Sequence, residues 1–305
     1  MSSEIKVDTI SENTAANGVS IDGLTIKDGG ISATTGAIVF NEASADVDFR
    51  VESNGNASML HVNGGNNLVG IGADPDLGAG LHIKTADTGA SVDGNADELV
   101  IEGTRSGLSI LSANNDFGYI LFGDDGSNNI GSIRYGHSAN DLRIIVGGNE
   151  AMVIDATGAV TMPLQPCFRV GSGTQDNVAV SANVNVIFSN EIFDTNADFN
   201  TGTYTFTAPV TGKYQFEVLL RIDNADTAYS YIQMVLGGSN RNTTMDTLSP
   251  VSNFMSADGE VSLRGSAILD MDTNDTAIVR IRMQGGTAQA DINSDGSYFM
   301  GHLIG

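Results

Sequence analysis

The chain has 305 residues, with 37 glycines, one cysteine, no tryptophan and a formal charge of −23 at pH 7. So acidic a chain lacks the Lys and Arg needed to neutralise phosphate, which argues against nucleic acid and anionic membrane as partners. The first residues show no basic segment followed by an apolar run, and no stretch approaches the ~18 apolar residues of a membrane span, so we expect neither a secretory signal nor membrane insertion.

Short apolar segments separated by turn residues run through the first part of the chain. Val19 and Ile21 alternate with polar residues, as do Leu24 and Ile26, and Asp-Gly pairs separate them. Residues 47–51, 58–62 and 68–72 repeat this pattern between Asn and Gly. Each segment is too short to bury itself, so the pattern indicates β-structure that needs neighbours.

Two stretches of this part resemble bacteriophage fibres. The segment NEASADVDFRVESNGNASMLHVNGGNNLVGIG resembles the stalk repeats of tail fibres and tail spikes. The opening SSEIKVDTISENTAANGVSIDGLTIKDGGI is similar to the N-terminal segment of marine phage fibres, which contacts the tail. The resemblance implies a virion-attachment segment at residues 1–40, with phage tail or baseplate proteins as its partners, and a glycine-rich β shaft at 41–97.

Residues 98–162 form a second section, in which strand-like segments recur about every ten residues, as in all-β folds. Within it, IGSIRYGHSANDLRIIVGGNEAMVIDATGAV is similar to a shaft repeat that precedes the C-terminal module of phage spikes. Short strands with open edges aggregate unless they are paired or covered, so three chains sharing one shaft is a physical reason for a homotrimer. We therefore expect a second β shaft or neck module at 98–162.

The C-terminal part contains the clearest strand pattern. In residues 200–218, Tyr204 and Phe206 alternate with threonines, and Tyr214, Phe216 and Val218 alternate with polar residues after a Pro-Gly corner. Further alternating segments follow, separated by Asn, Asp, Gly and Ser turns. The pattern predicts an antiparallel sandwich or jelly roll.

Residues 163–305 resemble the globular head of complement component 1q. The resemblance rests on Phe168, Val186, Phe188, Asn190, Phe193, Phe199, residues 201–206, Pro209, Gly212, Tyr214, Phe216, residues 265–269, the Asn274-Asp275 turn and residues 298–304. His302 departs from the aromatic-rich last strand of that family. The resemblance implies a ten-stranded jelly roll of the tumour-necrosis-factor type, a homotrimer, and action by binding. The fold class predicted for the whole chain is thus all-β: an elongated trimeric shaft followed by a jelly-roll head.

One loop has the composition of a calcium ligand set. Asp291, Asn293 and Asp295 match the first half of a calcium loop, D-x-N-x-D-G, but the twelfth position is His302 where a bidentate Glu is needed. The loop is therefore no EF-hand, and the alternatives are a Ca²⁺ site of hard oxygen ligands and an ordinary polar turn. No other cofactor is expected.

Catalysis is not expected. The pairs Asp124-Asp125 and Asp270/Asp272 offer two carboxylates, but adjacent Asp residues in an acidic chain usually belong to turns, and sequence spacing cannot set their separation. The grooves of sugar-cleaving spikes are often lined by Trp, which this chain lacks. We therefore predict that the protein is not an enzyme.

Strand alternation predicts which loops share the far end of the head. If the C-terminus returns to the end where residue 163 enters, loops near residues 223–229, 248–258 and 284–295 lie at the opposite tip. Loops on a rigid β scaffold commonly carry recognition. The predicted receptor-binding residues are Asp223, Asn224, Asp226, Tyr229, Asn253, Phe254 and Gln289.

These observations predict a phage tail fibre or spike subunit, made in the host cytoplasm and located in the virion, whose head binds a polysaccharide or protein receptor on the bacterial surface. Two alternatives remain open at the level of sequence: a capsule-degrading tail spike enzyme, and a decoration or collar fibre that binds no receptor.

Overall fold

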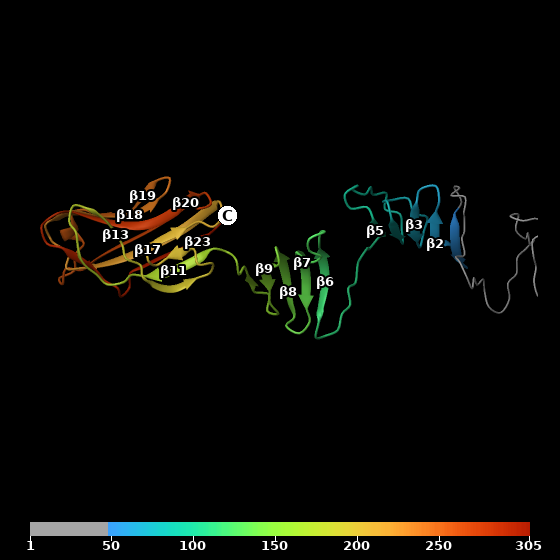
Figure 1. Ribbon diagram of the computed structural model, residues 1–305, viewed down its shortest axis with the longest axis horizontal. Helices are drawn as coiled ribbons and strands as arrows, with labels where there is room; N and C mark the ends of the chain where they lie inside the picture. The colour runs from blue at the N-terminus through green and yellow to red at the C-terminus, as the bar shows by residue number, and fades with distance from the viewer. Residues whose placement is uncertain (1–47) are drawn as a thin grey trace, which may run out of the picture. The chain divides into compact units, whose positions relative to one another are not determined.

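A computed structural model describes residues 48–305, so the predicted attachment segment at 1–40 and the start of the predicted shaft lie outside the described residues (Figure 1). The described residues divide into two compact units, the first ending at Ser109 and the second starting at Ile110. Between residues 48 and 305 the structure is built from strands, with one 3-10 turn, η1 (Val251–Asn253), and contains no helix able to cross a membrane. The predicted all-β class is confirmed.

The first unit contains a five-stranded sheet. Its strands are β1 (Phe49–Ser53), β2 (Asn56–Asn63), β3 (Leu68–Ile71), β4 (Leu81–Lys84) and β5 (Leu99–Glu102). β1, β2 and β3 pair antiparallel through short Asn-Gly turns, whereas β3, β4 and β5 pair in parallel, which requires longer connections at 72–80 and 85–98. The sheet reaches past the expected boundary between residues 97 and 98, because β5 pairs with β4.

The second unit begins with another five-stranded sheet. β6 (Phe117–Phe122), β7 (Gly131–Gly136), β8 (Asp141–Val146), β9 (Asn149–Ile154) and β10 (Val160–Thr161) form an antiparallel meander, each strand pairing with its neighbour in the sequence. Turns of Asn, Asp and Gly join the strands, and Gly147 and Gly148 both adopt positive φ between β8 and β9.

The head, residues 163–305, consists of two packed sheets (Figure 1). Its strands are β11 (Cys167–Gly171), β12 (Gln175–Val178), β13 (Asn183–Asn185), β14 (Asn190–Asp194), β15 (Phe199–Asn200), β16 (Thr205–Thr207), β17 (Gly212–Asp223), β18 (Tyr229–Gly238), β19 (Asn242–Leu248), β20 (Val261–Met271), β21 (Thr276–Gly285), β22 (Ala290–Ile292) and β23 (Tyr298–Leu303).

The larger head sheet is organised around β17. This strand pairs with β20 along one side and with β23 and β22 along the other, and β11 and β14 extend the sheet beyond β23. In the smaller sheet, β21 is central: it pairs with β18 on one side and with β16 and β13 on the other. All these pairings are antiparallel, which confirms the predicted jelly roll.

Alternate residues of the long strands fill the space between the two sheets. Along β17 every second residue from Tyr214 to Ile222 is fully buried, as are Ile232, Met234 and Leu236 on β18. The base of this core is aromatic: Phe168 stacks on Phe206 with ring centroids 5.0 Å apart. Burial of each such side chain contributes roughly 1.5–3 kcal/mol, so the head has a core of its own.

Gly301 on β23 makes room for that aromatic cluster. A Cβ at this position would lie 2.5 Å from Cδ1 of Phe216 and 2.9 Å from Cε1 of Phe168. A larger residue would therefore have to displace both rings. The neighbouring His302 points to solvent, so this departure from the family pattern leaves the core unchanged.

The two ends of the head lie at the same end of the sandwich. Cys167 at the start of β11 pairs with His302 near the end of β23, and the Leu303 N–H donates to the Pro166 carbonyl at 3.0 Å. Because β17 starts at this end, strand alternation places the 224–228, 249–260, 286–289 and 293–297 connections at the other end. We call that other end, with its four connections, the loop end.

Candidate binding surfaces

One face of the β1–β5 sheet is apolar across all five strands. The register aligns two rows of side chains, one from each strand in both rows: Phe49, Val62, Val69, Leu81 and Leu99, then Val51, Leu60, Ile71, Ile83 and Ile101. Directly opposed residues of neighbouring strands share a face. Leu99 is 52% exposed in a single chain, Val51 46% and Ile71 42%, so much of this face is accessible to solvent within the described residues.

The opposite face of the same sheet is charged and closed by its own loops. His61 lies between Asp48 and Asp74, with Nε2–Oδ2 and Nδ1–Oδ1 distances of 2.8 and 2.9 Å. The 72–80 connection packs directly on Gly70, where a Cβ would lie 2.6 Å from the Ala73 carbonyl oxygen. This sheet therefore buries its polar face and exposes its apolar one.

A second charged group continues on that face around Lys84. Its Nζ lies 2.7 Å from Asp76 Oδ2 and 3.5 Å from Glu102 Oε2, while His82 Nε2 is 3.1 Å from Glu102 Oε2. Hydrogen bonds from the Thr88 backbone N–H and hydroxyl, with the Lys84 charge, lower the pKa of Glu102 to about 2. The pKa of Lys84 is raised, chiefly by its hydrogen bond to Asp76.

Asp76, His82 and Glu102 are the one trio of possible metal-ligating side chains found among residues 48–305, with ligand atoms within 4.8 Å of each other. Lys84 already places a positive charge between the two carboxylates. We therefore assign the trio to an ion-pair network that fastens the loops. Sequence reasoning missed this network because its members, all within residues 76–102, meet only when β4 pairs in parallel with β5 and the 72–80 connection packs against the sheet.

The β6–β10 sheet repeats the division into two faces. Ile120, Ile133, Ile144 and Met152 align in one row, and Tyr135, Leu142, Ile154 and Val160 align in a second row on the same face. Ile120 is 44% exposed and Val160 52%. On the other face Arg134 and Arg143 both contact Glu150, at 2.9 and 2.5 Å, and lie over the ring of Phe117.

The loop end of the head brings four of the predicted residues together. Asn224 donates to Asp291 Oδ2 at 2.7 Å, and Asn293 donates to Asp223. Gln289 is bound nearby through its side-chain amide, which donates to the Asn177 carbonyl at 3.0 Å. Asn253 and Phe254 are exposed on the 249–260 loop, with 53% of Phe254 accessible.

Asp226 and Tyr229 hold the loop end together. The carboxylate of Asp226 accepts from the backbone N–H groups of Ala228, Thr287 and Ala288, which lower its pKa. Tyr229 is only 1% exposed and donates its hydroxyl to the Ala288 carbonyl at 2.7 Å. The prediction that Tyr229 contacts a receptor thus needs correction: a register shift between Tyr229 and Tyr231 turns it into the core, and its role is to position the loop.

Two of the three possible calcium ligands, Asp291 and Asn293, already accept hydrogen bonds. Asp291 Oδ1 accepts from the Asn177 backbone N–H and its Oδ2 from Asn224, while Asn293 Oδ1 accepts from the Asp295 backbone N–H at 2.7 Å. Asp223 Oδ1 is buried without a hydrogen-bond donor, and Arg221 Nε lies 3.9 Å from it. Calcium at Asp291, Asn293 and Asp295 stays a prediction.

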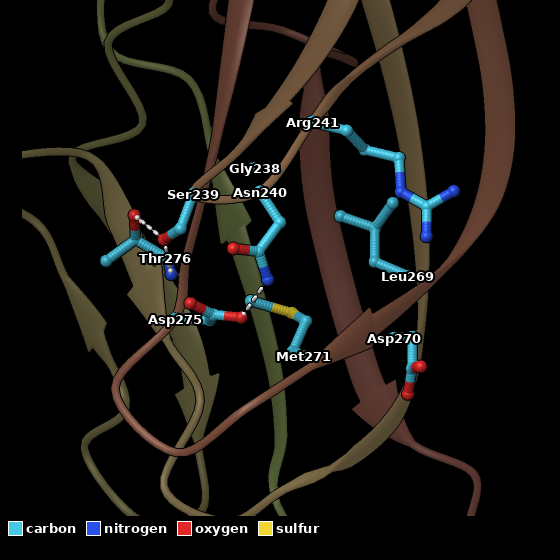
Figure 2. Close-up of a pocket in the computed structure, with 9 residues that line it drawn as sticks. All are labelled: Gly238, Ser239, Asn240, Arg241, Leu269, Asp270, Met271, Asp275 and Thr276. Carbon is cyan, nitrogen blue, oxygen red and sulfur yellow. Dashed lines mark hydrogen bonds between the residues drawn. The ribbon is translucent and has the colours of Figure 1, made fainter.

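A small pocket lies at the opposite end of the head, between the β18–β19 and β20–β21 turns (Figure 2). Figure 2 shows its polar groups joined to each other: Asn240 donates to Asp275 Oδ2 at 2.6 Å, and the hydroxyls of Ser239 and Thr276 lie 3.0 Å apart. Asp270, of the Asp270/Asp272 pair considered for catalysis, also lines it. These contacts stabilise the two turns, and we assign the pocket no ligand.

The head matches one known domain family. Residues 167–304 match the sequence model of the C1q domain family, and C1q/TNF-like domains are typically non-enzymatic binding domains. This region of the chain is therefore a C1q-like domain. No curated protein matches the chain.

Three solved structures are similar to the head. The globular domain of zebrafish complement 1qA protein is 18% identical and covers 46% of this chain and 98% of its own, with a TM-score of 0.34. Murine APRIL is 10% identical, covering 46% and 99%, and Eiger TNF from S. frugiperda is 14% identical, covering 46% and 93%; both have TM-scores of 0.35. These scores are below 0.5, so the domain assignment rests on the family match.

Proposed function

We propose that the protein is a homotrimeric fibre or spike subunit of a phage virion, which binds a receptor on the bacterial surface through its C-terminal head during adsorption. The observation that carries this proposal is the pair of uncovered apolar sheet faces at β1–β5 and β6–β10. Soluble monomers rarely expose apolar patches of this extent, and patches that do occur mark interfaces.

Three copies provide a cover for these faces. If three equivalent sheets turn their apolar faces toward a common axis, each apolar face is buried and the other side of each sheet faces outward. C1q/TNF-like homologues form trimers, so a trimeric head and a trimeric shaft would share one symmetry. Receptor contacts would then be repeated three times per fibre, which raises the apparent affinity of weak single sites.

We propose the loop end of the head as the receptor-binding surface. Asp223, Asn224, Asn253, Phe254 and Gln289 offer carboxylate, amide and aromatic groups there, and Asp226 and Tyr229 hold the connections that carry them. Loops on a rigid sandwich can vary in sequence without loss of the core.

The solution mass tests the assembly. A chain of 31.7 kDa gives 3 × 31.7 = 95.1 kDa for a trimer, to be measured by light scattering at micromolar concentration. A stable monomer would overturn the fibre architecture. Receptor binding is tested separately. The amount of protein bound to a panel of bacteria is compared for the parent trimer and for a Phe254→Ser, Asn253→Ala variant that keeps the same oligomeric state. Equal binding of both proteins would show that the loop end is not the receptor-binding surface.

The apolar faces are tested with a matched pair of substitutions in β1 and β3. Ile71→Asp places a negative charge on the apolar face, and Arg50→Asp places one on the charged face, where Arg50 lies opposite His61; the original side chains are 42% and 46% exposed. We expect Ile71→Asp to shift the mass toward 31.7 kDa, because a charge buried without a partner is strongly unfavourable, while Arg50→Asp stays trimeric. Equal behaviour of the two variants would show that this face is not the interface.

A further inference from the structure

Two arginines lie next to each other on the outer face of the smaller head sheet without an acidic partner. Arg280 and Arg282 are alternate residues of β21, so both leave the same face, while Ile281 between them is buried in the core. Among residues 48–305, Arg134, Arg143 and Arg221 each contact a carboxylate, but no carboxylate oxygen lies within 4.0 Å of either of these two guanidinium groups.

The contacts of these guanidinium groups are with neutral amides. Arg280 donates from Nε to Asn185 Oδ1 at 3.3 Å and from Nη1 to Asn242 Oδ1 at 3.4 Å, and Arg282 donates from Nη2 to Gln284 Oε1 at 3.0 Å. Arg282 Nε is buried without an acceptor. Two positive charges and one unused donor therefore remain on this face, in a chain whose formal charge is −23.

The strands on either side add uncharged polar groups. β13 and β18, labelled in Figure 1, both pair with β21: Asn185 lies opposite Arg280, Gln233 opposite Arg282, and Tyr231 opposite Gln284. Gly237 leaves room for the Arg280 side chain, since a Cβ there would lie 2.4 Å from its Nη1. We call Arg280, Arg282, Asn185, Gln233, Gln284 and Tyr231 the guanidinium strip.

We propose that the guanidinium strip binds an anionic glycan through its carboxylate or phosphate groups. The planar fork of a guanidinium matches either group with two parallel hydrogen bonds. Amide side chains both donate and accept, as sugar hydroxyls require, and the half-buried Tyr231 ring offers an apolar surface to a sugar ring. This site goes beyond the proposed function, because it lies on the side of the head and not among the connections of the loop end.

The test uses the full chain and four probes: oligogalacturonate for carboxylates, phosphorylated dextran for phosphates, neutral dextran, and polyglutamate as an acidic polymer that is not a glycan. We expect at least one charged glycan to bind in calorimetry, and neutral dextran and polyglutamate to bind at least ten-fold more weakly. The charged probe that binds identifies the group recognised.

Substitutions locate the binding. Arg280→Gln and Arg282→Gln should each weaken binding by about ten-fold, because each removes a charge-assisted hydrogen bond, and Gly237→Ala should weaken it by displacing Arg280 with no change of charge. The matched control is Arg264→Gln, which removes the same charge from an exposed position on β20 of the other sheet. Every variant is first shown to keep the mass and thermal transition of the parent protein.

Three results would overturn the proposal. These are the absence of binding by both charged glycans, equal binding of polyglutamate, and an equal loss of affinity in Arg264→Gln. The first result would show that the guanidinium strip binds no such glycan. Either of the other two would show that binding is a nonspecific attraction between opposite charges and does not depend on the guanidinium strip.

Discussion

The head and the β1–β5 sheet use the same strand alternation in opposite ways. In the head, the apolar residues of one sheet meet those of the other, and Phe216, Val218 and Leu220 are fully buried within a single chain. In the β1–β5 sheet the polar residues are buried under loops, while Val51, Ile71 and Leu99 are exposed. The difference shows that the head supplies its own core, whereas the other sheet leaves its apolar side chains exposed in a single chain.

The largest expected effect on stability comes from a cavity in the aromatic core of the head. Phe216→Ala should lower the free energy of unfolding of the head by about 3–5 kcal/mol, because the truncated ring leaves a cavity among Phe168, Phe206 and Phe299. Chemical denaturation followed by tyrosine fluorescence measures this loss. Ile268→Ala, which removes a side chain that is 59% exposed, serves as the control and should change stability little.

A smaller effect is expected from the charged face of the β1–β5 sheet. Lys84→Met leaves Asp76 and Glu102 without their cation and should destabilise the first unit by about 2 kcal/mol, less than for a fully buried pair because the side chain of Asp76 is 54% exposed. Segment-resolved hydrogen exchange should show faster exchange in β4 and β5 and unchanged exchange in β17. Unchanged exchange in β4 would contradict the role given to this network.

Acid acts on the two regions to different extents, because lowered carboxyl pKa values are more numerous in the first unit. The pKa of Glu102 falls from 4.5 to about 2 on folding, so its contribution is complete above pH 4.5 and is lost as pH falls toward 2. The pKa values of Asp48 and Asp74 are lowered too, mainly by hydrogen bonds to His61 and Ser58. In the head, burial raises the pKa of Asp198, so its protonation on acidification favours the folded state, while backbone hydrogen bonds lower the pKa of Asp226, whose protonation has the reverse effect.

We therefore expect the first unit to lose protection before the head as pH falls below 4.5. Hydrogen exchange corrected for the intrinsic pH dependence measures this order. Glu102→Gln should reduce the pH dependence of β5 without changing that of β17. Loss of protection in the head first would refute the assignment of these carboxylates as the acid-sensitive element.

The fold of the head could be predicted from the sequence because the alternation of apolar and polar residues within each strand already identifies the core residues. Tyr214, Phe216 and Val218 alternate with polar residues, and the structure buries all three. The prediction was wrong for Tyr229, because a register shift between residues 229 and 231 reverses the face that alternation alone implies. The apolar rows of the first sheet were also missed, since they depend on which strands pair and in which register, information that no single strand contains.

The adjacency of Cys167 and His302 has a consequence for how such a chain can change over time. Because the head begins and finishes at one end of its sandwich, recombination in the linker near residue 163 can replace it as a cassette while the preceding sheets are kept. Substitutions among the connections at the other end, the proposed receptor-binding surface, leave this junction unchanged. The proposed functions of binding and of attachment can therefore evolve at separate rates in one gene.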